Sequence, residues 1–384
     1  MPHFSKIHVQ GFRRLKDVEL PLGPLNVLVG PNGAGKTSLL DAFRLLSSSA
    51  DGKLREQLSV WRGISEQLSA IAGKREIRLE LDLTRDDRPD PLSYLLALEP
   101  TGLAYRISEE RLSEHRIAGK PPFLHLSSQN GAVKFFNPVT KHLETPGWEL
   151  VLSESSLCQV PKTFPDAEKF KQKLASVELF HHLDIGPQAP VRLPQAMQPA
   201  THPGTNGEYL LSCLYSLREQ NPDRFETIED TLRTAFPGFQ RLGFPPVAAG
   251  TIAMTWHEEH LRDPVYTHQL SEGTLRFIWL TTLLQSESLP AVTLIDEPEI
   301  SLHPQLLGLL ADLMRDASRR TQLIVATHSE RLIGHLKPEE VIVCGIGADG
   351  FACAKPAAAL DLQHWMQDFA LDELWRMGKF EERE

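Results

Sequence analysis

The first 50 residues show apolar and polar positions in an order that is typical of strands followed by a helix. The segments "KIHVQGF" and "DVELPLGPLNVLVG" alternate or run apolar, and they lead into the glycine-rich stretch "GPNGAGKTS" at residues 30–38. The segment "TSLLDAFRLLSSS" then predicts a helix. A glycine-rich turn between a strand and a helix is therefore the first feature expected of this fold.

The middle of the chain carries shorter patterns. Residues 76–83 place four apolar side chains on one face, as a half-buried strand does, and further short strands are predicted at "LAYRIS", "AVKFF" and "WELVL". These strands indicate an antiparallel lobe. Residues 186–207 contain five prolines and three glycines, which predicts a loop or lid rather than a regular element. Two helices are expected beyond it, and Asn221 is the predicted N-cap of the second, ahead of Pro222.

Three apolar segments further along the chain are each joined to polar residues. "LSEG" opens an apolar helix at Ser271. The apolar strand in "AVTLIDEPEISLHP" ends in Asp296 and Glu297, and the strand "QLIVAT" ends in His328. The carboxyl ends of such strands are where α/β sheets place their chemistry. Each piece also has a purely structural interpretation, because serines and acidic pairs often cap helices and strand-end histidines are often structural.

Composition narrows the class of protein. The chain has 384 residues, of which 41% are hydrophobic and 23% charged, and this is typical of a soluble globular protein with one or two domains. No apolar run approaches the roughly 20 residues of a membrane span, and the N-terminus has no signal-peptide core, so a cytoplasmic protein is expected. The formal net charge of −10 argues against an extended nucleic-acid surface and leaves room for a local basic patch.

The stretch at residues 30–38 has the G-x-x-x-x-G-K-[ST] spacing of a phosphate-binding loop. Its glycines let the backbone curl so that several N–H groups point at an anion. The helix that begins near Lys36 adds its positive end. In this chemistry Lys36 contacts the β- and γ-phosphates of a nucleotide, and the Thr37 hydroxyl holds Mg²⁺.

The acidic and histidine residues downstream suit the same chemistry. Asp296 suits a water bound to Mg²⁺, and Glu297 suits a base that orients or deprotonates the attacking water. A histidine at position 328 can donate to the γ-phosphate. The order of the four motifs, each at a junction of strand and helix, favours this functional interpretation over the structural one.

With these motifs the chain resembles an ABC-type ATPase head of the group that contains RecF, SMC and OLD proteins, and most of all a compact bacterial ATPase without coiled coil or Toprim domain. The resemblance is strong over residues 1–46 and about 265–345 and weak between them. It implies an α/β fold, namely a P-loop NTPase of the ABC-ATPase head type with an antiparallel β lobe and a helical insertion. It also implies ATP and Mg²⁺ as cofactors, and a homodimer whose protomers sandwich two ATP molecules.

The resemblance assigns roles to particular residues. The nucleotide-binding set is Gly30, Asn32, Gly33, Ala34, Gly35, Lys36, Thr37, Ser38, Ser271 and Gly273. The catalytic pair is Glu297 with His328, and the metal-binding pair is Thr37 with Asp296. Ser271 and Gly273 form the signature of one protomer and would contact the γ-phosphate held by the other, at the N-terminus of the helix that starts at Glu272. The Q-loop glutamine of the family is not identified, and its candidates are Gln57, Gln67 and Gln188.

The chain departs from familiar members of the group. More than 230 residues separate Thr37 from Ser271, which is too long for a transporter head, and the prolines throughout this gap argue against a long coiled coil. Only 56 of the 384 residues follow His328, too few for a Toprim nuclease, so an ATPase head alone is expected. The expected organisation is a head over residues 1–355, divided into an N-terminal lobe at 1–160, an inserted helical or lid region at about 161–250 and a C-terminal lobe at 251–355, followed by a helical tail at 356–384.

Two functions remain open. The favoured one is ATP binding and hydrolysis by a homodimer that acts in DNA repair or antiphage defence. The alternative is a nucleotide-gated switch or scaffold that controls a separate effector, such as a nuclease encoded nearby. DNA-stimulated hydrolysis would favour the first function, and a stable complex that dissolves on hydrolysis would favour the second. No membrane partner is expected.

Overall fold

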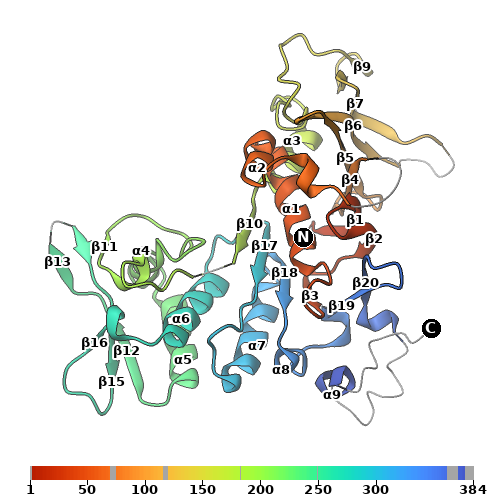
Figure 1. Cartoon of the computed structure of the whole chain (residues 1–384). Helices are drawn as coiled ribbons and strands as arrows, with labels where there is room; N and C mark the ends of the chain where they lie inside the picture. Colours follow the sequence, from red (N-terminus) through yellow and green to blue (C-terminus); the bar gives the residue numbers. More distant parts are fainter. Residues whose placement is uncertain are drawn as a thin grey trace. The chain divides into compact units, whose positions relative to one another are not determined.

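The structure is a computed structural model, and it describes residues 2–69, 75–115, 120–181, 183–248, 250–360 and 371–376 (Figure 1). The chain forms two compact units. The first contains the described residues up to Val177 and within 337–369 and 374–384, and the second those within 178–336 and 370–373. Across the described helices, none is long and apolar enough to cross a membrane.

The first unit contains an antiparallel sheet, whose described strands follow the order β2-β1-β4-β5-β6-β7-β8-β9. They are β1 Phe4–Phe12, β2 Leu15–Pro21, β4 Ile77–Leu83, β5 Leu92–Thr101, β6 Ala104–Glu114, β7 Phe123–Gln129, β8 Ala132–Asn137 and β9 His142–Glu144. Every second side chain of β4 is buried, so the predicted half-buried strand is confirmed. The strands predicted at "LAYRIS" and "AVKFF" are confirmed as parts of β6 and β8.

The strand predicted at "WELVL" is wrong, because residues 148–152 form no strand. Trp148 instead stacks on Phe135, with ring centroids 5.5 Å apart. The backbone N–H of Val151 donates to the side-chain carbonyl of Gln159 at 2.8 Å, and the Gln159 amide donates back to the Val151 carbonyl at 3.1 Å. A side chain thus satisfies the backbone groups through which a neighbouring strand would pair.

The glycine-rich turn lies in the first unit, between a buried strand and a helix. Strand β3 (Leu25–Val29) is buried along its whole length and pairs in parallel with β19 (Val341–Ile346), which pairs antiparallel with β20 (Ala352–Pro356). Helix α1 (Lys36–Ala50) follows the turn, as predicted. The other helical elements of this unit are α2 Leu54–Val60, α3 Pro165–Ala175 and the 3₁₀ turns η1 Ile64–Gln67, η5 Pro338–Glu340 and η6 Ala357–Ala359.

The second unit is built around two parallel strands. Every residue of β17 (Val292–Asp296) and β18 (Gln322–Thr327) is buried, as is usual for strands of a parallel sheet. Its helices are α4 Leu210–Gln220, α5 Pro222–Ala235, α6 Glu272–Gln285, α7 Leu307–Ala317 and α8 Glu330–Ile333, with 3₁₀ turns η2 Pro190–Arg192, η3 Thr267–Gln269 and η4 Pro304–Leu306. Its other strands are β10 Val177–Phe180, which begins at the boundary residue, β11 Gln195–Ala196, β12 Phe239–Gly243, β13 Pro246–Ala248, β14 Thr251–Ile252, β15 Thr255–Glu258 and β16 Val265–Tyr266.

Two predicted features of the second unit have clear physical counterparts. The side chain of Asn221 accepts from the N–H of Arg224 at 3.3 Å, so the predicted N-cap of α5 is confirmed. Residues 186–207 form a loop with only the short η2 and β11, and they pack against α6, where the Trp279 indole donates to the Gly204 carbonyl at 3.0 Å. A movement of this loop as a lid stays a prediction.

Of the predicted helical tail, α9 (Leu371–Arg376) is described, and residues 361–370 and 377–384 lie outside the described residues.

A buried carboxylate anchors a loop to the antiparallel sheet. Glu110 of β6 is 0% exposed. Its oxygens accept from the hydroxyls of Tyr94 and Ser155 at 2.8 and 2.6 Å, and from the N–H groups of Ser156 and Leu157 at 2.7 and 3.0 Å. Burial, together with the charge of Glu110, raises the pKa of Tyr94 well above its usual value, so its hydroxyl remains a donor.

We expect Glu110→Gln to lower the free energy of unfolding of the full chain by about 2–4 kcal/mol, because an amide group replaces an acceptor and leaves buried donors without partners. Urea denaturation followed by circular dichroism measures the loss. Glu149→Gln removes an exposed carboxylate of the same unit and should change the value by less than about 0.5 kcal/mol. Equal unfolding midpoints for the two variants would contradict the anchoring role.

Candidate functional site

The turn between β3 and α1 has the backbone of a phosphate-binding loop. Gly33 and Gly35 have φ angles of +81° and +88°, in the left-handed region that favours glycine. A Cβ added at Gly35 would lie 2.8 Å from the Cβ of Ala352, and one added at Gly30 would lie 2.2 Å from the carbonyl oxygen of Cys344. The loop is therefore shaped by close approach to β19 and β20 as well as by its own dihedral angles.

Lys36, the first residue of α1, fills this loop with a positive charge. Its side chain is buried, with 5% of the residue exposed, and Nζ donates to the carbonyls of Gly30 at 2.7 Å and Pro31 at 3.0 Å. The N-cap of α1 is Gly35, which has no side chain to bond the first N–H groups of the helix. An ammonium group, helix N–H groups without a side-chain cap and glycines at positions 30, 33 and 35 together fit the phosphates of a nucleotide.

The remaining predicted residues of the loop differ in exposure. Ala34 is buried, Ser38 is half-buried, and Asn32 and Thr37 are exposed. The Thr37 residue thus remains accessible to a ligand, as the predicted role in holding a metal ion requires.

The predicted signature residues form the N-terminus of α6 in the second unit. The Ser271 hydroxyl caps this helix by accepting from the Thr274 N–H at 3.1 Å, so the structural interpretation of this serine holds. Ser271 is also exposed. A Cβ at Gly273 would lie 2.4 Å from the carbonyl oxygen of Ser301, and the Ser301 hydroxyl donates to Glu272 at 2.5 Å. The signature segment therefore packs directly against the chain that follows β17.

Asp296 is the last residue of β17 and is buried, with 4% of the residue exposed. His181, which follows β10, places Nδ1 3.0 Å from Asp296 Oδ2 while its own side chain is 54% exposed. Within the described part of the chain, no group of three His, Cys, Asp or Glu residues could by itself hold a metal ion. Mg²⁺ in nucleotide sites is bound by one or two protein groups together with phosphates and waters, so a single carboxylate fits that ion.

Glu297 stands in a strained backbone conformation. Its φ is +50°, a region that costs a residue with a side chain on the order of 1–2 kcal/mol. Its N–H donates to the Ala326 carbonyl at 2.8 Å, and its carbonyl accepts from Arg276 Nη2 at 3.0 Å. His328 Nε2 lies 3.3 Å from Glu297 Oε1. The structure thus brings the two predicted catalytic residues together, and hydrogen bonds hold both the N–H and the carbonyl of Glu297.

A second acidic residue joins the two strand ends. Glu299 Oε1 accepts from the Thr327 hydroxyl at 2.6 Å and from the His328 N–H at 2.9 Å. This carboxylate therefore fixes the backbone that carries His328 to the loop that carries Glu297.

The sequence reasoning missed His181, Arg276 and Glu299. Their signals are weak: a histidine after a strand, one arginine in the apolar run "TLRFIWL", and the third acidic residue of "DEPE". Burial lowers the pKa of Arg276, and the nearby carboxylates of Glu272, Glu299 and Glu297 act in the opposite direction. A guanidinium keeps its proton under such conditions, so α6 contains a permanent buried charge.

The candidate Q-loop glutamines Gln57 and Gln67 form hydrogen bonds with residues outside the glycine-rich loop. Gln67 accepts from Arg13 Nε and donates to the Trp61 carbonyl, both at 2.8 Å. Gln57 accepts from the Ser48 hydroxyl at 3.4 Å, and Gln188 is exposed. The identity of the Q-loop residue stays a prediction.

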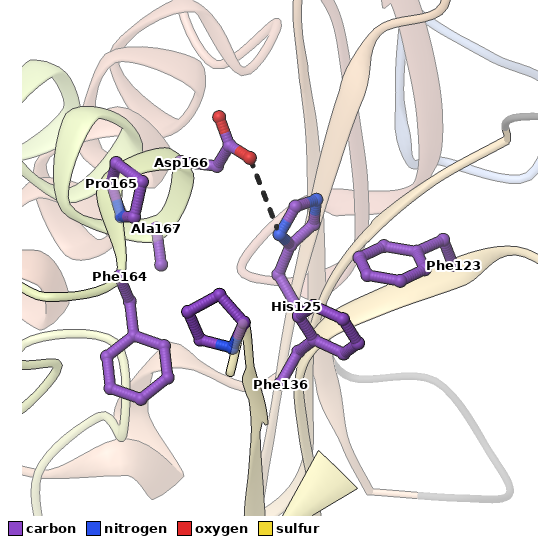
Figure 2. Close-up of a pocket in the computed structure, with 8 residues that line it drawn as sticks. Phe123, His125, Phe136, Phe164, Pro165, Asp166 and Ala167 are labelled. Carbon is purple, nitrogen blue, oxygen red and sulfur yellow. Dashed lines mark ion pairs between the residues drawn. The ribbon is translucent and has the colours of Figure 1, made fainter. Parts of the chain in front are cut away.

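A small pocket lies elsewhere in the first unit, with a volume of about 100 Å³ (Figure 2). Its lining residues are Phe123, His125, Phe136, Pro138, Phe164, Pro165, Asp166 and Ala167. His125 Nδ1 lies 3.8 Å from Asp166 Oδ2 across its wall, as the dashed line in Figure 2 shows. None of the predicted site residues is among this lining, so the pocket is separate from the candidate site.

The comparison with known families decides the assignment. The family described as "AAA domain, putative AbiEii toxin, Type IV TA system" matches residues 25–334. The chain belongs to this family. The match includes the glycine-rich loop, the signature segment and both strand ends with their acidic and histidine residues.

Curated relatives of this AAA-domain chain match over shorter segments. The OLD nuclease of Thermus scotoductus is 50% identical over 51 residues, which is 13% of this chain and 10% of that protein. The DNA replication and repair protein RecF of Nitrosococcus oceani is 27% identical over 137 residues, which is 35% of this chain and 34% of RecF. The chain thus matches about a third or less of the length of these relatives.

Solved structures confirm the predicted fold class. An SMC head bound to the C-winged helix domain of ScpA aligns with a TM-score of 0.54 at 16% identity, covering 92% of this chain and 97% of that one. An SMC head with an extended coiled coil derived from Pyrococcus furiosus aligns with a TM-score of 0.51 at 14% identity, covering 99% of both. The AAA-domain chain has the fold of an ABC-type P-loop ATPase head of the RecF, SMC and OLD group.

The left-handed backbone at position 297 generates a stability prediction. Glu297→Gly should be more stable than Glu297→Ala by about 1 kcal/mol, because glycine adopts φ +50° without strain. At Asp312, an exposed position within α7, the order should reverse, and Asp312→Ala should be the more stable by about 1 kcal/mol. Urea denaturation of the four variants measures both differences. The same order at both positions would show that Glu297 is not in the left-handed region.

Proposed function

We propose that this chain is a Mg²⁺-dependent ATPase that works as a homodimer. The observation that carries the proposal is the loop at residues 30–38, where Lys36 Nζ is held between two backbone carbonyls beside an uncapped helix end. Membership in a P-loop ATPase family supports a nucleotide as the ligand. In this proposal the N–H groups of the loop and Lys36 bind the β- and γ-phosphates of ATP.

Two residues would hold the metal ion. The Thr37 hydroxyl would bind Mg²⁺ directly, and Asp296 would bind it through a water molecule. When bound, Mg²⁺ neutralises negative charge on the phosphates. The contact from His181 orients the Asp296 carboxylate for this role.

Glu297 and His328 would act on the attacking water and the γ-phosphate. The Glu297 carboxylate orients the water for in-line attack and accepts its proton, and His328 donates a hydrogen bond to the γ-phosphate. Because His328 Nε2 lies 3.3 Å from Glu297 Oε1, the histidine also fixes the carboxylate. The geometry supports a pair that acts as one unit rather than two independent groups.

The N-terminus of α6 supports a contact in trans. Ser271 is exposed, and Gly273 adds no side chain to the first turn of the helix. A helix end of this kind suits a phosphate oxygen, because its N–H groups and positive dipole face the ligand. We infer that Ser271 and Gly273 of one protomer contact the γ-phosphate held by the other.

The names of the relatives support a role linked to DNA. They include a DNA replication and repair protein and a nuclease, and we extend this to a function in DNA repair or antiphage defence. A second candidate is a nucleotide-gated switch that controls a separate effector protein. The net charge of −10 favours this protein partner over an extended DNA surface. ATP hydrolysis that accelerates with added DNA would support the first role, and an effector complex that dissolves on hydrolysis would support the second.

Two substitutions should separate binding from turnover. Lys36→Ala should weaken the binding of a fluorescent ATP analogue by at least tenfold or about 1.4 kcal/mol, because charge-assisted hydrogen bonds are lost. Glu297→Gln should bind the analogue within about twofold of the parent but lower kcat by about 100-fold or more, because the general base is gone. Light scattering should then show an ATP-dependent dimer. Parental nucleotide affinity in Lys36→Ala would refute the ATPase proposal.

Mixing two inactive variants tests the trans contact. Ser271→Arg should block the signature, and Lys36→Ala should block the phosphate loop. A heterodimer of the two retains one site with an intact loop and an intact signature, so a mixture should recover about a quarter of the parental activity if subunits exchange at random and one site suffices. Tagged pull-down confirms the exchange. Subunit exchange without any recovery of activity would contradict sites that are completed in trans and hydrolyse ATP independently.

A further inference from the structure

Arg276 is a buried charge within the signature helix. It lies in α6, five positions after Ser271, and only 2% of the residue is exposed. Most of the residues around it in this helix are apolar and buried. A charged group in such a place costs free energy unless its hydrogen bonds are made, so its partners indicate what it does.

The partners of Arg276 lie in the catalytic segment. Nη2 donates to the carbonyl of Glu297, the residue with φ +50°. In the described part of the chain, Nε of Arg276 is buried without a hydrogen-bond partner, and so is Oε2 of Glu299. The other oxygen of Glu299 holds the Thr327 hydroxyl and the His328 N–H. A donor and an acceptor of opposite charge are thus both left unsatisfied beside the catalytic residues.

The N-terminus of α6 also packs directly against the chain that follows β17. A Cβ at Gly273 would lie 2.4 Å from the Ser301 carbonyl oxygen, and Ser301 donates to Glu272. Because packed interiors do not deform continuously, a shift of this helix end must displace the chain that follows β17. The unsatisfied pair offers a defined second arrangement, in which Arg276 Nε donates to Glu299 Oε2.

We propose that Arg276 is a positioning residue that couples the signature helix to Glu297 and His328. When Ser271 engages the γ-phosphate, α6 shifts and Arg276 bridges the Glu297 carbonyl and the Glu299 carboxylate. Glu299 in turn holds the backbone of His328. The bridge therefore fixes the catalytic pair only in the nucleotide-engaged state. This inference rests on the proposed ATPase function and adds a route by which engagement of the signature controls hydrolysis.

A matched pair of arginine substitutions tests the coupling. Arg276→Met removes the guanidinium that would form the bridge and keeps an unbranched aliphatic side chain in its place. Arg320→Met is the control, because Arg320 donates to the carbonyls of Leu284 and Ser286 at the opposite end of α6, at 2.5 and 2.7 Å. Arg276→Met should lower kcat by about tenfold or more and change the dissociation constant of a fluorescent ATP analogue by less than about twofold. Arg320→Met should leave kcat within about twofold of the parent, even where it lowers the melting temperature.

A double-mutant cycle adds a readout that general structural damage does not produce. Ser271→Ala alone should lower kcat. In the Arg276→Met background the same change should have little further effect, because the bridge from Arg276 to Glu297 and Glu299, through which Ser271 acts, is already absent. Glu299→Gln should lower kcat to the same degree as Arg276→Met. If Arg276→Met fails to fold, Arg276→Lys replaces it in the cycle, since one ammonium group cannot bridge both acceptors in the geometry of a guanidinium. Effects of Ser271 and Arg276 that simply multiply would overturn the coupling.

The failure of this inference can be told from the failure of the ATPase proposal. Lys36→Ala tests nucleotide binding alone. If Lys36→Ala binds the ATP analogue like the parent, the proposed function falls and the coupling falls with it. If Lys36→Ala loses binding while Arg276→Met retains the kcat of Arg320→Met, only the coupling falls.

Discussion

The parallel register of β17 and β18 is the constraint on which the candidate site depends. Asp296 stands opposite Ala326, and both strands are buried throughout. Because the carboxyl ends of parallel strands meet at one edge, the residues that follow each strand become neighbours, and Glu297 and His328 come within 3.3 Å. A slip of one residue would turn the buried side chains of one strand to its opposite face, so the apolar packing that fixes this register also fixes the chemistry.

Strain at Glu297 shows how that packing is used. The left-handed backbone of this residue costs on the order of 1–2 kcal/mol, and its carboxylate lies 3.3 Å from His328 Nε2. Two hydrogen bonds, to the Ala326 carbonyl and from Arg276, each contribute about 1 kcal/mol and offset it. One of these partners belongs to a strand and the other to the signature helix. The conformation of a single residue is thus held by two elements that are distant in sequence.

The local features that the sequence pattern predicted are those set by neighbouring residues. The glycine-rich turn, the half-buried β4 and the Asn221 cap each depend on a pattern within a few positions. The strand expected at "WELVL" does not form. The side chain of Gln159, which lies outside the pattern, makes hydrogen bonds with the backbone N–H and carbonyl of Val151. His181 lies 115 positions from Asp296, and Arg276 lies 21 positions from Glu297, so no local pattern could have joined either pair.

The position of Lys36 explains why the loop is suited to an anion before one binds. Its ammonium donates to the carbonyls of Gly30 and Pro31, and this keeps a positive charge inside the loop at little cost in free energy, because both hydrogen bonds are made. A phosphate oxygen that carries a full negative charge forms a bond roughly twice as strong as a neutral carbonyl does. The exchange of a carbonyl for a phosphate is therefore favourable and requires only a small movement of a compact ammonium group. Arginine would not be equivalent at this position, because its planar guanidinium is bulkier and presents its donors in a fixed fork rather than as a compact point charge.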